Sequence, residues 1–189
     1  MTLRIIQVEE IKGLLRQVPA LVDQLERRDS GFYEDLLAWL RRVEAVLEAN
    51  RLASVSDVAA LRSTLVQAGR GQLLPELHVE GRPTRKKIRE VAGSHVIHQG
   101  NGLLQDLLRA PLANLEEADR ICRQLAAVAR AKGYVEASLQ EQGHAAALAE
   151  LIRCMAADPD LAAAYVHLTG LVGTQDAAIL LDRAVPELG

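Results

Sequence analysis

The sequence has few aromatic residues: one Phe, three Tyr and one Trp among 189 residues. The core must therefore be filled by Leu, Ile, Val and Ala, side chains that pack closely between helices. No apolar run approaches the roughly 20 residues needed to cross a bilayer. The opening residues, MTLRIIQVEEIKG, contain neither the apolar segment nor the small-residue cleavage site of a secretory signal. We therefore expect a cytoplasmic protein that does not enter a membrane.

Cysteine is equally scarce. Cys122 and Cys154 fall on the apolar stripes of predicted helices, and no CxxC pattern accompanies them. This placement predicts reduced thiols in the core, with a disulfide or a reactive thiol as the alternatives.

The chain also lacks a strong excess of one charge and any cofactor motif. Its formal net charge of -3 gives no general attraction to nucleic acid or to an anionic membrane, so such an attraction would have to be local. The sequence has no phosphate-cradling glycine loop and no nucleophile elbow. His95 and His98 are spaced to share a ligand, but no carboxylate or thiol accompanies them. We expect no cofactor and no metal.

The chain does have a clear helical period. Hydrophobic residues make up 49% of it, enough to bury a core without disulfides or metals. They recur every three or four positions, and no run alternates as a strand does. The sequence predicts an all-α protein, either a helical bundle or a two-lobed array of helical hairpins. It should have roughly seven to nine helices and no sheet.

The first part of the chain predicts helices whose ends carry recognisable signals. Pro19 should kink or divide the first helix, since a proline removes a backbone hydrogen bond. Ser30 is placed to cap the second helix, and Ser54 with Asp57 resembles a capping box at the start of the third. The predicted helices cover residues 8–28, 32–52 and 54–69.

The stretch from Gly69 to Pro83 is the least helical in the chain, with three glycines and two prolines. It suggests an irregular joint at 71–83 between an N-terminal lobe, 1–70, and a C-terminal lobe, 84–189. One continuous domain is the alternative.

The second half predicts several shorter helices. Gly93 should weaken the first of them, and the stretch HQGNG, 98–102, should end it as a turn. The next helix should end before Pro111, and Asn114 should cap the one after it. Asp158 and Pro159 form a helix start further on. The predicted helices begin at Thr84 and then cover 103–109, 114–133, 135–157, 159–172 and a last segment to Val185.

The segment AALAELIRCMAADPDLAAAYVHL resembles the join between tetratricopeptide repeats. The spacing of Ala147, Leu151, Pro159, Tyr165 and Leu168 carries the resemblance. It implies a helical hairpin over about residues 140–180 that presents a binding surface; an ordinary antiparallel hairpin with a capped turn is the alternative.

One segment, 82–102, differs from the rest because its first eight positions hold five basic residues. On a helix, Ile88, Val91, Ala92 and His95 form one inward stripe beside a basic edge. The segment is therefore a solvated helix start with a half-buried histidine, or a contact for phosphate groups of nucleic acid or another anion. The residues that would make this contact are Arg82, Arg85, Lys86, Lys87 and Arg89.

The same segment permits a catalytic interpretation. Arg89, five intervening residues and His95 resemble the motif of HEPN domains, many of which are metal-independent ribonucleases acting as dimers. The resemblance implies that His95 moves the proton of the RNA 2′-hydroxyl and Arg89 stabilises the charged phosphate. On a continuous helix the two lie about 120° apart. Their convergence would need a break at Gly93 or a dimer partner.

The expected function is that of a non-enzymatic helical interaction protein: an adaptor, accessory subunit or regulator. Apolar positions around Leu37, Trp39 and Val46, and the alanine-rich final helices, suggest surface available to a protein partner or to self-association. The alternatives are a HEPN-like ribonuclease using Arg89 and His95, and an accessory subunit that contacts a nucleic-acid backbone through residues 82–89.

Overall fold

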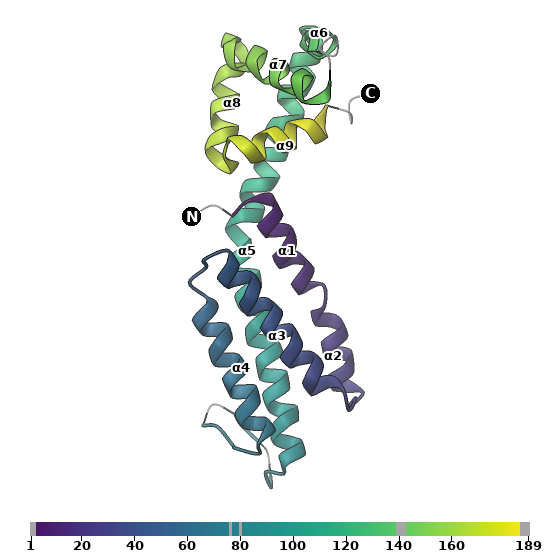
Figure 1. The fold of residues 1–189 in the computed structure, drawn as a ribbon, viewed down its shortest axis with the longest axis vertical. Coiled ribbons are helices and arrows are strands. Elements are labelled where there is room, and N and C mark those ends of the chain that lie inside the picture. Colours follow the sequence, from purple (N-terminus) through teal and green to yellow (C-terminus); the bar gives the residue numbers. More distant parts are fainter. Residues whose placement is uncertain (1–2, 76, 80, 139–142, 186–189) are drawn as a thin grey trace. The chain divides into compact units, whose positions relative to one another are not determined.

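The computed structural model describes residues 3–75, 77–79, 81–138 and 143–185. These residues form α-helices joined by turns, with no strand among them, which confirms the predicted all-α fold (Figure 1). None of the described helices is long and apolar enough to cross a membrane. The helices are α1 (Ile5–Leu15), α2 (Val18–Glu26), α3 (Phe32–Ala49), α4 (Val55–Gly69), α5 (Arg85–Ala131), α6 (Tyr134–Ser138), α7 (His144–Ala157), α8 (Pro159–Val172) and α9 (Thr174–Ala184).

The chain divides into two compact units. One is Ile6–Arg109, and the other is Ala110–Gly189 together with Met1–Ile5. The irregular stretch 71–83 lies inside the first unit, so this grouping differs from the sequence-based lobes. The reason is a shared core: Ala68 and Leu77 pack with Ile88 and Ala92 at the start of α5. The division into lobes at 71–83 and its alternative, one continuous domain, both stay predictions.

The core of the unit Ile6–Arg109 is built around α3. The predicted stripe Leu36, Leu40, Val43 and Leu47 is fully buried, as expected from its helical spacing. Trp39 is buried too, and its indole Nε1 donates a hydrogen bond to the Leu14 carbonyl at 3.0 Å. The expectation of free apolar surface around Leu37 and Trp39 is therefore wrong, because α3 packs on several sides.

Pro19 divides the first predicted helix as expected. It lies in the first turn of α2, where its missing amide costs no hydrogen bond. The predicted cap at Ser30 is wrong, because Gly31 occupies the N-cap of α3. Ser54 holds the N-cap position of α4 as predicted, but its side chain makes no capping hydrogen bond.

Helix α5 runs without interruption where several short helices were predicted. Two of the glycines expected to weaken or end it, Gly93 and Gly100, are packing positions instead: a Cβ atom on Gly93 would lie 2.6 Å from Phe32 Cε1, and one on Gly100 would lie 2.9 Å from Trp39 Cη2. Close approach of these rings requires residues without side chains. Pro111 lies inside the helix and Asn114 caps nothing, so the predicted boundaries around them are also wrong.

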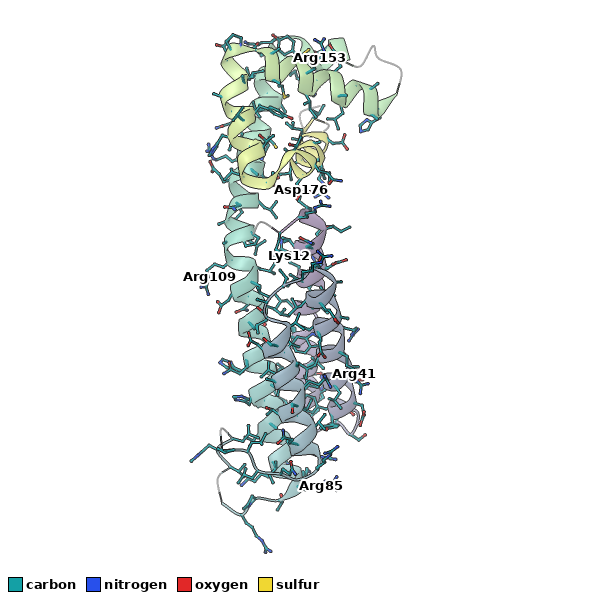
Figure 2. The ribbon with its side chains drawn as sticks, turned by 60° about the vertical axis from the view of Figure 1, so that its left-hand side comes forward. Lys12, Arg41, Arg85, Arg109, Arg153 and Asp176 are labelled. Atoms are coloured by element: carbon teal, nitrogen blue, oxygen red, sulfur yellow. The ribbon has the colours of Figure 1, made fainter. Side chains whose placement is uncertain are left out.

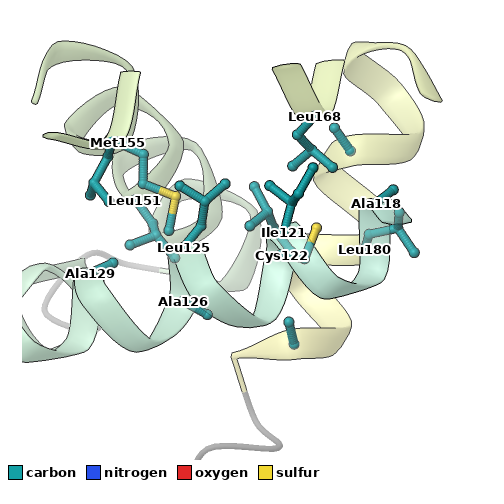
Figure 3. Packing of buried hydrophobic residues seen from close by; sticks show 14 of the residues in the cluster. Ala118, Ile121, Cys122, Leu125, Ala126, Ala129, Leu151, Met155, Leu168 and Leu180 are labelled. Carbon is teal, nitrogen blue, oxygen red and sulfur yellow. The ribbon is translucent and has the colours of Figure 1, made fainter. Parts of the chain in front are cut away.

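The second unit packs α7, α8 and α9 with the C-terminal part of α5 around the apolar cluster in Figure 3. Asp158 caps α8 as predicted, accepting a hydrogen bond from the Asp160 amide at 2.8 Å, and Pro159 begins the helix. The single helix predicted over 135–157 is wrong: α6 ends at Ser138, and Gly143 precedes α7 with a left-handed φ of 99°. Residues 139–142 lie outside the described part of the chain.

Buried polar groups also fix this unit. The Asp176 carboxylate, in the first turn of α9, is buried and accepts a hydrogen bond from the Ile5 amide at 2.8 Å (Asp176 is labelled in Figure 2). Ile5 is therefore held against α9 by a satisfied hydrogen bond from its amide as well as by its buried side chain.

Candidate anion-binding site

The basic segment contributes to a pocket of about 380 Å³ in the unit Ile6–Arg109. The end of α2 and the turn after it, the start of α3, and the first turns of α5 form its walls. Arg85, at the start of α5, is labelled in Figure 2. The lining residues are Leu25, Arg28, Asp29, Ser30, Phe32, Tyr33, Arg85, Lys86, Arg89 and Glu90.

Two of the arginines are held by one backbone carbonyl at the end of α4. Arg85 donates from Nε and Nη2 to the Gly69 oxygen at 3.0 and 2.8 Å, and Arg89 donates from Nη2 to the same oxygen at 3.0 Å. The carboxyl-terminal end of a helix carries partial negative charge, which favours cations there. The carbonyl fixes the two guanidinium groups in place, but it is neutral and does not cancel their charge.

Tyr33 forms the floor beneath Arg89. Its hydroxyl donates to the Leu65 carbonyl at 3.1 Å, and the Arg89 guanidinium carbon lies 5.0 Å from the ring centroid, a cation–π distance. Burial raises the pKa of the Tyr33 hydroxyl, and the positive charge of Arg89 partly opposes that shift. Gly69 is required here because a Cβ atom would lie 2.1 Å from Tyr33 Oη.

Two polar atoms in this pocket are buried and unsatisfied. Neither Arg89 Nε nor Glu90 Oε1 has a hydrogen-bond partner among the residues that the structure describes. Arg28 Nε approaches Glu90 Oε1 only to 3.8 Å. A buried donor and a buried acceptor without partners are unusual in a folded protein.

Arg28 has a backbone conformation that favours glycine. Its φ is 57°, and it terminates α2 with two hydrogen bonds, from its own amide to Leu25 O at 3.1 Å and from the Asp29 amide to Gln24 O at 2.9 Å. Helices that end in this way usually place glycine at this position. Arg51, with φ of 54°, ends α3 with the equivalent hydrogen bonds but does not line the pocket.

The structure brings together only part of the predicted basic set. Arg85, Lys86 and Arg89 line the pocket, whereas Arg82 and Lys87 are exposed and do not. The contributions of Arg28, Tyr33 and Gly69 were not predicted, because these residues are distant in sequence from the basic segment. The left-handed position of Arg28 had no local signal.

Arg89 and His95 lie on one unbroken helix, because α5 does not break at Gly93. The period of the helix separates them by about 120°. His95 is half-buried and does not line the pocket that contains Arg89. A single copy of the chain therefore does not show the convergence that the HEPN-like interpretation needs, and a dimeric arrangement is not tested.

The two cysteines and the possible metal ligands are the other candidate groups. Both cysteines are free thiols, and burial raises the pKa of Cys122 to about 12. Such a thiol stays protonated and unreactive at neutral pH. Within the described residues, no group of three or more His, Cys, Asp or Glu side chains is placed to hold a metal ion.

Comparisons with protein-family models, with curated proteins and with solved structures give no match for this chain. Neither the tetratricopeptide nor the HEPN resemblance gains support from them.

Proposed function

We propose that this chain is a non-enzymatic helical interaction protein, an adaptor, accessory subunit or regulator, and that it works through protein–protein contacts. The single observation that carries the proposal is the outer face of α8. The exposed residues along this face are Ala163, Val166, His167 and Gly170, and no Asp, Glu, Lys or Arg occurs between Asp160 and Asp176.

An uncharged outer face is unusual for a helix with one buried side. Leu161, Leu168 and Val172 already bury the inner face of α8, so a charged or strongly polar outer face would be expected. Instead Val166 is 67% exposed. Apolar surface that a single copy leaves open is a common mark of a protein-binding site.

The occupant that we propose for this face is a second copy of the chain. A two-fold dimer places the same patch on both sides of the interface, so the patch must be complementary to itself. The α8 side chains of this face meet this condition, because none of them is Asp, Glu, Lys or Arg and two copies can pack them together without like-charge repulsion. Charged faces such as the one carrying Arg120 and Arg123 do not.

Light scattering on two matched variants tests the proposal. Val166→Glu would place a charge in the centre of the interface and should weaken association of the copies by at least about tenfold. Ile6→Glu changes a residue that is equally exposed, at 64%, on α1, and it should leave association unchanged. Equal association of Val166→Glu and wild type would contradict the role of α8.

A further inference from the structure

A second binding function lies in the unit Ile6–Arg109 and does not depend on α8. We infer that the pocket lined by Arg28, Arg85, Lys86 and Arg89 binds a phosphomonoester, either as a small molecule or as a phosphorylated side chain of a partner protein.

Fixed but uncompensated cations are the first support. Arg85 and Arg89 are oriented by three hydrogen bonds to the neutral Gly69 carbonyl. Among the residues that the structure describes, neither arginine forms an ion pair with a carboxylate. Arginines that are already oriented lose little freedom when they bind an anion, which favours binding.

Charge balance identifies the class of anion. Three arginines and one lysine line the pocket against two carboxylates, Asp29 and Glu90, which leaves a formal charge of +2. A phosphomonoester carries about -1.5 to -2 charges at pH 7, whereas a carboxylate or a sulfate ester carries one. Of these groups, the phosphomonoester matches the pocket best.

The lining cations indicate how the ligand is held. Arg28, Arg85 and Lys86 line the pocket and carry N–H donors for the phosphate oxygens. Leu25, Phe32 and the Tyr33 ring offer apolar contact for the carbon part of the ligand. The pocket volume of about 380 Å³ falls within the usual range for small-molecule sites.

Arg28 provides a specific variant because its backbone favours glycine. Arg28→Gly removes one cation and relieves a left-handed backbone, so the fold should be retained. Arg51→Gly makes the same backbone change at the end of α3, away from the pocket. Any difference in binding between the two variants therefore reports on the side chain of Arg28.

The experiment is isothermal titration calorimetry of the full chain. The ligands are O-phosphoserine, O-sulfoserine, a phosphoserine peptide, the same peptide without phosphate, and single-stranded RNA. Wild type and Arg51→Gly should bind phosphoserine, free or in the peptide, and Arg28→Gly should bind about ten- to a hundredfold more weakly. The free compound and the peptide distinguish the two sources of the phosphate.

Three results would overturn the inference. They are no binding of either phosphoserine form by wild type, equal binding of O-sulfoserine and O-phosphoserine, and equal binding by the Arg28→Gly and Arg51→Gly variants. Binding of RNA alone would also overturn it, in favour of backbone contact through the basic segment. None of these results bears on self-association through α8, so the two proposals fail separately.

Discussion

Asp158 shows how one residue can serve a helix and a polar cluster at once. Its carboxylate caps α8, accepts two hydrogen bonds from Lys132 Nζ at 2.9 and 2.7 Å, and accepts one from the Tyr134 hydroxyl at 2.7 Å. These donors stabilise the ionised carboxylate and lower the pKa of Asp158 to about 2. The Lys132 contact is the largest cause of that shift.

The pKa of Asp158 predicts a specific loss of stability in acid. Its pKa in the folded chain lies below the usual 3.8, so the ionised form favours folding. This contribution is complete above the unfolded pKa and disappears as the pH falls from 3.8 towards about 2. The urea midpoint of wild type should therefore fall through this window.

Asp158→Asn isolates the effect, because asparagine also caps helices well but carries no charge. We expect this variant to be less stable than wild type at neutral pH and to lose less stability across the acid window. Asp160→Asn is the control: this side chain is 76% exposed and its carboxylate pairs with Lys132 at 2.7 Å, so the pH profile of the variant should resemble that of wild type. If the urea midpoints of wild type and Asp158→Asn fell in parallel as the pH is lowered, that result would be inconsistent with the lowered pKa of Asp158.

Among the elements, α5 is the one that the sequence predicted least well. A glycine or proline predicts the end of a helix reliably only where contacts between residues adjacent in sequence determine the backbone conformation. At Gly93 and Gly100 the deciding neighbours are Phe32 and Trp39, which come from α3 and are far away in sequence. The predictions at Pro19 and Asp158 succeeded because a helix start depends on adjacent residues.

Replacing a glycine of α5 by alanine should lower the free energy of unfolding at two positions, Gly93 and Gly100, and raise it at a third, Gly102. Alanine at Gly93 or Gly100 would collide with a buried ring and should lower the free energy of unfolding by about 1–3 kcal/mol. Apart from its two neighbours in the chain and the surrounding backbone of α5, no described atom lies within 4 Å of a Cβ added at Gly102, so Gly102→Ala should raise the free energy of unfolding by about 0.5–1 kcal/mol. Urea denaturation measures the free energy of unfolding of each of the three variants. A stabilising Gly93→Ala would show that Phe32 does not pack there.

The candidate site was predictable only where its residues are neighbours in the sequence. Five basic residues in one short segment pointed to an anion, and three of them line the pocket. The sequence could not reveal that the Gly69 carbonyl orients Arg85 and Arg89, since that contact depends on how α4 packs against α5. Nor could it place Arg28 beside them.

For the whole molecule, the main alternative to a binding function is ribonuclease activity. Because Arg89 binds the Gly69 carbonyl and lies on an unbroken helix with His95, we expect no cleavage of RNA in the absence of metal. The assay compares wild type with His95→Ala on single-stranded RNA. Metal-independent cleavage by wild type that disappears in the variant would establish the HEPN-like alternative, with catalysis across a dimer.

The proposed role of the α8 face predicts self-association of the chain. Sedimentation equilibrium of the wild-type chain over a range of concentrations measures it without any substitution. The predicted result is a mass that rises with concentration from 20.6 kDa to twice that value, as a reversible dimer requires. A constant mass of 20.6 kDa at every concentration would contradict the proposal.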